Sequence, residues 1–438
     1  MDKFHIVGPT RLAGRVSASG AKNAALPALA ASLLTDEPLL LHRVPRVRDL
    51  RTMARLLDHL GVASEEKSGG LVFHRTRPNN PEADEAPYDL VKTMRASVLV
   101  LGPLLARFGQ ARVSLPGGCA IGVRPIDQHL KGLEALGADI HLAHGYVETR
   151  ARRLTGARFR FDMATVTGTE NVLMAACLAQ GTSVLENCAR EPEVVDLANL
   201  LNAMGARISG AGTETIVVEG VGNLNGLGGA EHTIIPDRIE GGTYLIGAAL
   251  TAGDVTLERA SAADLAPLLD KLADLGATVE VTKAPEWTAG RAASDSIRVH
   301  SDGELAARDV ETTPHPGFPT DLQAQYMVLM TKARGVATIR ETIFENRFQH
   351  APELARMGAD VRVEGAAARV HGPTPLTGAS VMATDLRASA CLVLAGVAAE
   401  GETVVDRIYH LERGYEGMEL KLQNLGARVA RWSTSPVA

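Results

Sequence analysis

A glycine-rich segment, residues 114–127, holds the side chains best suited to chemistry. It reads Ser-Leu-Pro-Gly-Gly-Cys-Ala-Ile-Gly-Val-Arg-Pro-Ile-Asp. Its glycines and prolines interrupt any helix or strand, so a loop is predicted. The loop presents the thiol of Cys119 near Arg124, and a neighbouring cation favours the reactive thiolate. A surface turn with an incidental cysteine is the alternative, and the loop alone does not distinguish the two.

The composition excludes several classes of protein. The chain has 438 residues, 45% of them hydrophobic and 22% charged, with a net charge of −6 and only 4% aromatic residues. An acidic balance argues against a general binder of nucleic acid or of anionic membranes. Few aromatics leave little to stack on single-stranded bases. A soluble globular protein with two or three domains is predicted.

The four cysteines indicate neither a metal site nor disulfides. Cys119, Cys177, Cys188 and Cys391 show no CxxC spacing and no accompanying histidine pattern. Cys177 and Cys391 lie in alanine-rich helical runs and are interpreted as small core residues. The sequence shows no signal peptide, and its apolar runs are too short to cross a bilayer. A cytoplasmic protein is therefore expected, and the cysteine spacing indicates no metal cofactor.

One signature recurs six times along the chain. An amphipathic segment ends in Leu or Met and is followed by Gly and then by Ala or Val, at intervals of about 70 residues. The glycine suits the left-handed position that ends a helix, and an alternating strand follows. Six repeats of about this length are predicted, with their helix-ending glycines at Gly61, Gly137, Gly205, Gly276, Gly358 and Gly426.

Each repeat also contains a second helix, rich in Ala, Gly and Ser. Small and apolar residues on all sides predict a helix that is packed by neighbours on every face. A charged residue stands near the start of each: Lys22, Arg95, Glu170, Arg238, Asp321 and Arg387. Helix N-termini and basic side chains favour anions, so a cleft lined by them would suit a phosphorylated or carboxylated ligand. Helix capping or salt bridging is the alternative, above all for Glu170. The glycine-rich run 220–229 is interpreted as a linker.

With these features the chain resembles the enolpyruvyl transferases, and among them the UDP-N-acetylglucosamine 1-carboxyvinyltransferase family. The resemblance extends over essentially the whole chain. It rests on long motifs in the family's order: Ser19–Pro27, Tyr88–Ser97, Ser114–Cys119, Ala189–Glu193, Pro319–Gln325, Glu345–Phe348, Ala383–Ser389 and Asp406–His410. The shikimate-pathway relatives lack the cysteine-bearing loop, which favours the sugar-nucleotide family.

The resemblance implies a two-domain inside-out α/β barrel with six pseudo-repeats, three in each domain. Buried helices would be surrounded by sheets and outer helices. Residues 22–233 would form one domain, which carries the Cys119 loop. Residues 1–21 and 234–438 would form the other, and the active site would lie in the cleft between the two.

The resemblance also implies a reaction. The enolpyruvyl group of phosphoenolpyruvate would pass to the 3-hydroxyl of UDP-N-acetylglucosamine with release of phosphate, the first committed step of peptidoglycan synthesis. Addition would give a tetrahedral intermediate, and elimination would follow. Cys119 matches the family's proton donor, which also forms a covalent adduct with phosphoenolpyruvate and is alkylated by fosfomycin. Asp321 matches the candidate base for the sugar hydroxyl.

Further residues match the family's binding positions. Those expected to bind phosphoenolpyruvate are Lys22, Asn23, Arg95, Cys119, Arg124, Arg387 and Arg413. Those expected to bind the sugar nucleotide are Asn23, Arg95, Arg124, Pro125, Ile126, Asp127, Gln128, Thr165, Val166, Thr320, Asp321 and Ile343. Some family members carry a lysine near the diphosphate where this chain has Met163. Asp385, Glu193 and Arg347 also match family motifs, with structural hydrogen bonding as an equal interpretation.

Two other functions remain open. A shikimate-3-phosphate enolpyruvyl transferase shares the fold and the reaction type. A non-catalytic protein that binds sugar nucleotides on the same scaffold would be expected to lack Cys119, Lys22 or Asp321, and this chain has all three.

Overall fold

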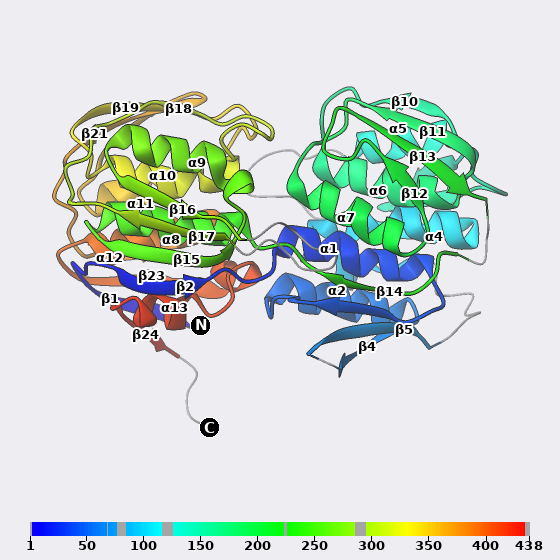
Figure 1. The fold of residues 1–438 in the computed structure, drawn as a ribbon, viewed down its shortest axis with the longest axis horizontal. Coiled ribbons are helices and arrows are strands. Elements are labelled where there is room, and N and C mark those ends of the chain that lie inside the picture. Colours follow the sequence, from blue (N-terminus) through cyan, green and yellow to red (C-terminus); the bar gives the residue numbers. More distant parts are fainter. Residues whose placement is uncertain are drawn as a thin grey trace. The chain divides into compact units, whose positions relative to one another are not determined.

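The computed structural model describes residues 2–67, 69–76, 85–115, 126–222, 226–284 and 295–433. These residues fall into two compact units (Figure 1). Unit 1 combines the N-terminal residues up to Ser19 with the described residues from Pro236 onward, and unit 2 holds the described residues from Gly20 to Ile235. Each unit has its own hydrophobic core. The domain limits expected from the sequence remain a prediction.

Six four-stranded sheets occur among the described residues, three in each unit, and all share one pairing pattern. A parallel pair at one edge is followed by two antiparallel pairs. The sheets of unit 2 have the orders β14-β3-β5-β4, β6-β7-β9-β8 and β10-β11-β13-β12. Their strands are β3 (Leu39–His42), β4 (Val62–Lys67), β5 (Gly70–Arg75), β6 (Glu85–Ala86), β7 (Gln110–Ser114), β8 (Asp139–Ala143), β9 (Tyr146–Arg150), β10 (Arg158–Arg160), β11 (Gln180–Glu186), β12 (Arg207–Ser209), β13 (Thr215–Val221) and β14 (Ala230–Thr233).

The sheets of unit 1 repeat this pattern but draw strands from both ends of the chain. Their orders are β22-β23-β1-β24, β16-β17-β15-β2 and β18-β19-β21-β20. The N-terminal strand β1 pairs with β23 and β24, and β2 pairs in parallel with β15. The strands are β1 (Lys3–Gly8), β2 (Ala13–Ser17), β15 (Asp254–Ala260), β16 (Thr278–Thr282), β17 (Asp295–His300), β18 (Val310–Glu311), β19 (Gly335–Arg340), β20 (Asp360–Glu364), β21 (Ala367–Gly372), β22 (Ser380–Met382), β23 (Gly401–Asp406) and β24 (Arg428–Trp432).

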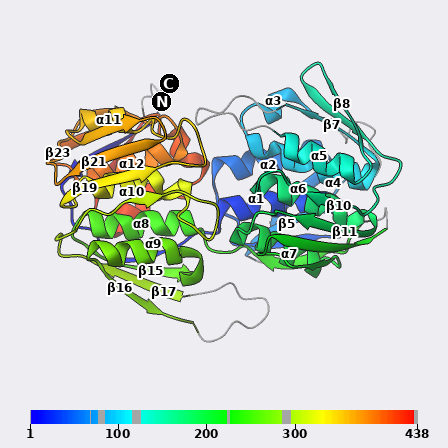
Figure 2. The ribbon, with the colours of Figure 1, turned by 90° about the horizontal axis from the view of Figure 1, so that it is seen from above.

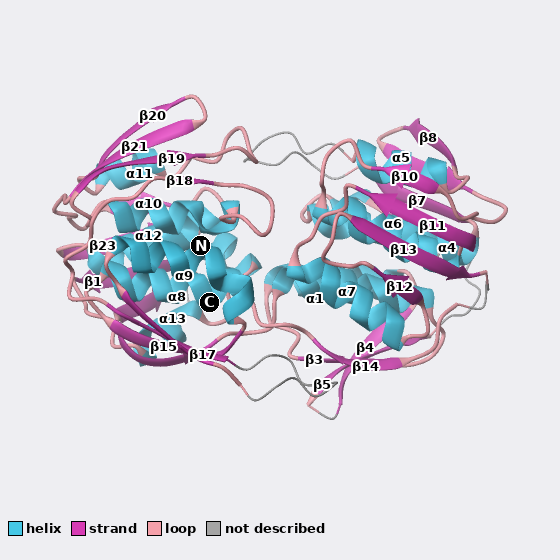
Figure 3. Cartoon of the chain, turned by 45° about the horizontal axis from the view of Figure 1, so that its top comes forward, coloured by secondary structure: helices cyan, strands magenta, loops and turns pink. Residues whose placement is uncertain are grey.

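Helices occupy the interior of each unit and strands lie outside them (Figure 3). In unit 1 the inner helices α8, α10 and α12 pack against one another (Figure 2). All eight residues of α10 are buried, because its side chains meet neighbours on every face. The inner elements are α1 (Lys22–Ala31), η1 (Ser32–Leu34), η2 (Arg95–Val100), α4 (Leu101–Phe108), α6 (Val166–Leu178), α8 (Arg238–Leu250), η3 (Thr320–Leu322), α10 (Gln323–Met330) and α12 (Leu386–Ala398).

The six amphipathic helices end as the sequence predicts. Each is followed within two residues by its glycine, and the φ angles of these six glycines lie between 86° and 108°. This left-handed region is costly for residues with a Cβ atom, which explains the recurring glycine. The helices are α2 (Arg48–His59), α5 (Asp127–Ala135), α7 (Pro192–Ala203), α9 (Ala262–Leu275), α11 (Ala351–Arg356) and α13 (Met418–Asn424). The short α3 (Tyr88–Val91) and η4 (Ile408–Arg413) complete the helical elements of the described chain.

The predicted start of one inner helix is wrong. We expected Glu170 at the beginning of the third inner helix, but α6 begins four residues earlier, at Val166. Thr165 caps the helix, because its side chain accepts a hydrogen bond from the backbone N–H of Gly168. Glu170 therefore lies inside the helix and is 1% exposed. Neither capping nor ligand binding explains it.

The chain leaves and re-enters unit 1 at two short segments. The carbonyl of Ser19 accepts a hydrogen bond of 2.9 Å from the backbone N–H of Asp237, and Ala21 donates one of 2.7 Å to the carbonyl of Ile235. Gly20 lies against the carbonyl oxygen of Arg43, 1.8 Å from where a Cβ atom would be. The first of these segments leads directly into α1, which begins with Lys22.

Candidate functional site

The carboxylate of Asp321 lies between two buried guanidinium groups in unit 1. Arg347 donates to its Oδ1 over 2.7 Å and Arg387 to its Oδ2 over 3.0 Å. The side chains of the two arginines are 4% and 5% exposed, whereas that of Asp321 is 26% exposed. Ionised partners of both signs make these hydrogen bonds strong and directional. Asp321 is thus held in a fixed orientation with part of its surface open.

Arg387 is placed by the start of α12. Asp385 caps this helix, because its Oδ1 accepts hydrogen bonds from the backbone N–H groups of Arg387 and Ala388. Burial lowers the pKa of Arg387, but Asp321, Tyr415 and Asp237 together more than offset this, and the pKa is raised above its ordinary value. Arg387 therefore stays a cation in the interior. The structure gives Asp385 the capping role that the sequence left open.

A buried carboxylate that the sequence did not reveal connects two expected substrate contacts. Glu341 is 3% exposed. Its Oε2 accepts a hydrogen bond of 2.9 Å from the hydroxyl of Thr320, and its Oε1 accepts one of 2.8 Å from the backbone N–H of Ile343. Glu341 thus fixes the turn before Asp321 to the segment that follows β19. No motif surrounds Glu341, so only the folded chain shows this role.

Arg413 is the last residue of η4 and is half-buried. Gly414 and Tyr415 follow it, and Tyr415 is 3% exposed. The same unit thus holds Thr320, Asp321, Ile343, Arg387 and Arg413 of the expected site.

In unit 2, Lys22 and Asn23 are the first two residues of α1, and both are half-buried. The ammonium of Lys22 lies 3.3 Å from Oδ2 of Asp49, which belongs to the first turn of α2. The side chains of Lys22 and Asp49 are 13% and 6% exposed. This buried pairing orients the ammonium group of Lys22.

The charges of Arg95 and Asp127 both act on a buried imidazole, that of His129. Burial first and Arg95 second lower the pKa of His129, Asp127 opposes them, and the net pKa is about 4. His129 is therefore neutral at pH 7. Its Nδ1 faces the amide nitrogen of Asn171 at 3.0 Å, so we assign the ring proton to Nε2, which faces the hydroxyl of Thr167 at 3.2 Å. His129 thereby fixes the start of α5 against α6.

Asp127 and Gln128 are the first two residues of α5. They differ in whether their polar atoms already have hydrogen-bond partners in the protein. Gln128 is committed to Asp162, because its Nε2 donates to Oδ2 and its Oε1 accepts from the backbone N–H, both over 2.9 Å. Asp127 accepts from Gln128 through Oδ2, whereas its buried Oδ1 has no hydrogen-bond partner within the described part of the chain. Asp127 Oδ1 is thus a buried acceptor without a partner among the described residues, whereas both polar atoms of the Gln128 amide are in use. Ile126, just before the helix, is buried.

The expected diphosphate contacts lie at the start of α6. The hydroxyl of Thr165 is used for capping, with Gly168 N at 3.4 Å, and Val166 is the first helical residue. Met163, the position at which some relatives carry lysine, is 61% exposed. An anion at this N-terminus would meet free backbone N–H groups and the positive end of the helix dipole. That role remains a prediction.

Cys119, Arg124 and Pro125 lie outside the described residues, so their roles also remain predictions. Within the described ranges, no group of three or more His, Cys, Asp or Glu side chains could hold a metal ion. No helix in the same ranges is both long enough and apolar enough to cross a lipid bilayer.

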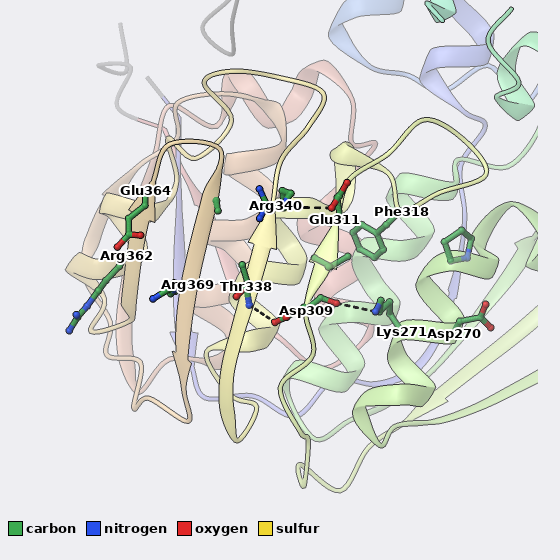
Figure 4. Close-up of a pocket in the computed structure, with 13 residues that line it drawn as sticks. Asp270, Lys271, Asp309, Glu311, Phe318, Thr338, Arg340, Arg362, Glu364 and Arg369 are labelled. Carbon is green, nitrogen blue, oxygen red and sulfur yellow. Dashed lines mark hydrogen bonds and ion pairs between the residues drawn. The ribbon is translucent and has the colours of Figure 1, made fainter. Parts of the chain in front are cut away.

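A pocket of about 930 Å³ lies elsewhere in unit 1, between α9 and the sheet that contains β18 to β21 (Figure 4). Its charged groups are largely satisfied within the protein. Lys271 donates to the carbonyl of Asp309 over 3.0 Å, and Oδ1 of Asp309 accepts a hydrogen bond of 2.7 Å from the backbone N–H of Thr338. The pocket contains none of the expected substrate contacts. Phe318, three residues before Asp321, forms part of its wall.

Comparisons with known proteins agree with this fold. A family model described as EPSP synthase (3-phosphoshikimate 1-carboxyvinyltransferase) matches residues 6–422. The UDP-N-acetylglucosamine 1-carboxyvinyltransferase of Koribacter versatilis (strain Ellin345) is 55% identical over 433 residues, 98% of this chain and 96% of that protein.

Solved structures show the same architecture. The enolpyruvyl transferase NikO from Streptomyces tendae matches with a TM-score of 0.85 and 27% identity over 99% of both chains. An EPSP synthase from Acinetobacter baumannii, 18% identical, matches in fold with a TM-score of 0.75 over 99% of this chain and 100% of that one. The inside-out α/β fold and these matches define an enzyme that transfers a 1-carboxyvinyl group, and the chain belongs to the enolpyruvyl transferase family. The fold class and the family expected from the sequence are confirmed.

Proposed function

We propose that the protein transfers the enolpyruvyl group of phosphoenolpyruvate to the 3-hydroxyl of UDP-N-acetylglucosamine and releases phosphate. One observation carries the proposal for the site: Asp321 is oriented by Arg347 and Arg387 and keeps an open surface. The relative from Koribacter versatilis, 55% identical, bears the name of this activity. The reaction would be the first committed step of peptidoglycan synthesis in the cytoplasm.

Two proton transfers accompany the addition step. Cys119 gives a proton to the methylene carbon of phosphoenolpyruvate, while the sugar oxygen bonds to the adjacent carbon and its proton passes to Asp321. A carboxylate held by two arginines is a weak base. It suffices because the hydroxyl proton becomes acidic as the carbon–oxygen bond forms. In the elimination, the Cys119 thiolate takes back a proton from the new methyl group and the carbon–oxygen bond to phosphate breaks. Asp321 returns its proton to the departing phosphate, and the enolpyruvyl ether is left.

Cations replace a metal in this scheme. Arg124, Arg387 and Arg413 would bind the carboxylate and phosphate of phosphoenolpyruvate, with Lys22 at the phosphate and Arg95 beside the substrates. The fixed orientation of Arg387 and Lys22 supports these roles, because both cations are placed before any substrate binds. Asp127 would accept a hydrogen bond from the nucleotide through its unpartnered Oδ1.

The first experiment measures phosphate release from phosphoenolpyruvate with UDP-N-acetylglucosamine or with shikimate 3-phosphate as acceptor. Release with the sugar nucleotide alone supports the proposal. Release with the shikimate compound alone rejects it in favour of the other transferase. Release with neither leaves a protein that binds sugar nucleotides without turnover.

The second experiment tests Cys119. The Cys119→Ala variant is expected to lose most turnover and still bind UDP-N-acetylglucosamine, and fosfomycin is expected to inactivate the wild-type protein by alkylating this thiol. Cys119→Asp retains an acidic proton, so it is expected to keep activity and resist fosfomycin. Near-normal turnover of Cys119→Ala would exclude the thiol as proton donor.

A further inference from the structure

Three inner helices of unit 1 present a polar group to the hydroxyl or ring of one tyrosine, Tyr415. Thr243 comes from α8, Gln325 from α10 and Arg387 from α12. Tyr415 itself lies in the segment between η4 and α13, two residues after Arg413. Taken as whole residues, all four are at most 4% exposed. Polar groups so deeply buried are costly unless they are hydrogen-bonded.

The hydrogen bonds of this cluster run in a defined direction. The hydroxyl of Thr243 donates to the carbonyl of Ile239 over 2.7 Å, so its only proton is already used. The hydroxyl of Tyr415, 2.9 Å from Thr243 Oγ1, must therefore act as the donor to it. Gln325 Nε2 donates to both oxygens, over 3.1 Å to Thr243 and 3.0 Å to Tyr415. The position of the tyrosine hydroxyl is thus set by two helices.

The ring of Tyr415 faces the third helix. The guanidinium carbon of Arg387 lies 5.5 Å from the centroid of this ring, within the range of a cation–π interaction. Arg387 thus has the tyrosine on one side and the Asp321 carboxylate on the other. Burial raises the pKa of Tyr415, with Arg387 opposing it, so the phenol stays protonated and able to donate.

We propose that Tyr415 is a positioning residue for the transfer reaction. Its hydroxyl fastens the segment that carries Arg413 to the inner helices, and its ring holds Arg387 against Asp321. A shift of this one side chain would misplace both a proposed phosphoenolpyruvate contact and the proposed base. The inference rests on the proposed function, because Asp321, Arg387 and Arg413 are the groups that it positions.

The test is Tyr415→Phe, which removes the hydroxyl and leaves the ring. We expect kcat to fall about tenfold, because small displacements of reacting groups are expensive. The KM for UDP-N-acetylglucosamine is expected to change less than about twofold, because the nucleotide contacts proposed in unit 2 are unaffected.

Tyr326→Phe is the matched control. Tyr326 is also fully buried in unit 1, and its hydroxyl donates to the carbonyl of Arg308 over 2.9 Å, away from Arg387. Tyr326→Phe loses one hydrogen bond, whereas Tyr415→Phe loses the bond to Thr243 and the one from Gln325. A purely structural role of Tyr415 therefore predicts a lower melting temperature but an unchanged kcat in both variants. Our inference predicts that Tyr415→Phe alone loses turnover.

A double-mutant cycle tests whether the Tyr415 hydroxyl acts through its hydrogen bond to Thr243. Thr243→Val removes the acceptor of the Tyr415 hydroxyl at nearly constant volume. If the hydroxyl acts through Thr243, the combined variant loses no more turnover than Tyr415→Phe alone. Additive losses, or a Tyr415→Phe variant within about twofold of wild-type kcat, would overturn the inference. Thr243→Val also provides the measurement if Tyr415→Phe fails to fold.

Wild-type turnover is measured first, so that a failure of the proposed function can be distinguished from a failure of the positioning role of Tyr415. An inactive wild-type protein rejects the proposed function. An active wild-type protein with a fully active Tyr415→Phe variant rejects the positioning role alone. A crystal structure of the variant gives a readout without turnover: the distance from Arg387 to Asp321 is expected to lengthen from 3.0 Å, and an unchanged distance contradicts the proposal.

Discussion

The ammonium group of Lys421 lies 2.6 Å from the carboxylate of Glu240 in the interior of unit 1. The Glu240 side chain is 2% exposed, and that of Lys421 is 20% exposed. Lys421 also donates to the hydroxyl of Ser19 over 2.7 Å, and Glu240 accepts from the backbone N–H of Ser19 over 2.7 Å. One buried ion pair thus anchors the residue at which the chain leaves unit 1 for α1.

The first prediction concerns Lys421→Met, which leaves the Glu240 carboxylate buried without its cation. We expect a loss of about 3–5 kcal/mol in the free energy of unfolding at pH 8. The double variant Lys421→Met/Glu240→Gln, which removes both charges, is expected to recover most of it. Urea unfolding measures both. A single variant as stable as the double one would contradict the prediction.

The same variant has a defined pH dependence. Burial raises the pKa of Glu240, and Lys421 opposes this. Without Lys421 the pKa rises further, and a carboxyl whose folded pKa is raised contributes stability at low pH that is lost as pH rises through that value. The deficit of Lys421→Met relative to wild type is therefore expected to shrink from pH 8 toward pH 5. A stability deficit of Lys421→Met that grows as the pH falls from 8 to 5 would contradict this prediction.

The second prediction concerns Glu170 in α6. Burial raises its pKa well above the ordinary value, and Glu193 and Glu191 raise it further. Wild-type stability is thus expected to be lost as pH rises through this value, whereas Glu170→Gln has no charge to lose. By pH 8 the variant should be the more stable by on the order of 1 kcal/mol. Glu219→Gln, at a side chain 63% exposed, is the control and should leave the pH dependence of unfolding unchanged.

The third prediction concerns Gly20→Ala. A Cβ atom at this position would lie 1.8 Å from the carbonyl oxygen of Arg43, so the backbone must shift. We expect a loss of at least about 3 kcal/mol, measured as a lower melting temperature. Gly228→Ala is the control, because its Cβ would meet nothing closer than 3.5 Å. Equal melting temperatures for the two variants would mean that the contact with Arg43 is not tight.

The fourth prediction concerns Asp321→Asn. Removing the proposed base is expected to lower kcat by about 10²–10⁴-fold, and binding of UDP-N-acetylglucosamine to unit 2 residues should persist. Asp309→Asn is the control, because its carboxylate lies in the separate pocket of unit 1. Phosphate release measures turnover and calorimetry measures binding. A variant with more than about a tenth of wild-type kcat would exclude Asp321 as the base.

Much of the fold follows from short-range patterns in the sequence. The six helix-ending glycines, from Gly61 to Gly426, adopt the left-handed backbone that their position after an amphipathic run predicts. The inner helices α10 and α12, rich in small and apolar residues, are buried on every face, as their composition predicts. These features depend on neighbours within a few residues, so they can be read from the chain.

One local feature differs from the prediction: Thr165, a better cap than Glu170, begins α6 one turn earlier than the sequence predicts.

Features that depend on distant residues are harder to predict. Arg347 and Arg387, which both bind the Asp321 carboxylate, lie 26 and 66 positions after it in the sequence. No local pattern indicates these two ion pairs. The family resemblance implies that Asp321 and Arg387 are site residues. For Arg347 it supports a structural and a functional role equally. Glu341 and Tyr415 have no local signal at all.

The pairing of β1 with β23 and β24 has a consequence for synthesis of the protein. Phe4 lies opposite Val405 and Arg431, so β1 is synthesised about 400 residues before both of its partner strands. At 5–20 residues per second this is roughly 20–80 s. The chain of unit 2 is complete once residue 235 has been made, long before that delay ends. In a growing cell, β1 is therefore an unpaired hydrogen-bonding edge until β23 and β24 have been made, and chaperones that bind extended segments would meet it during that interval.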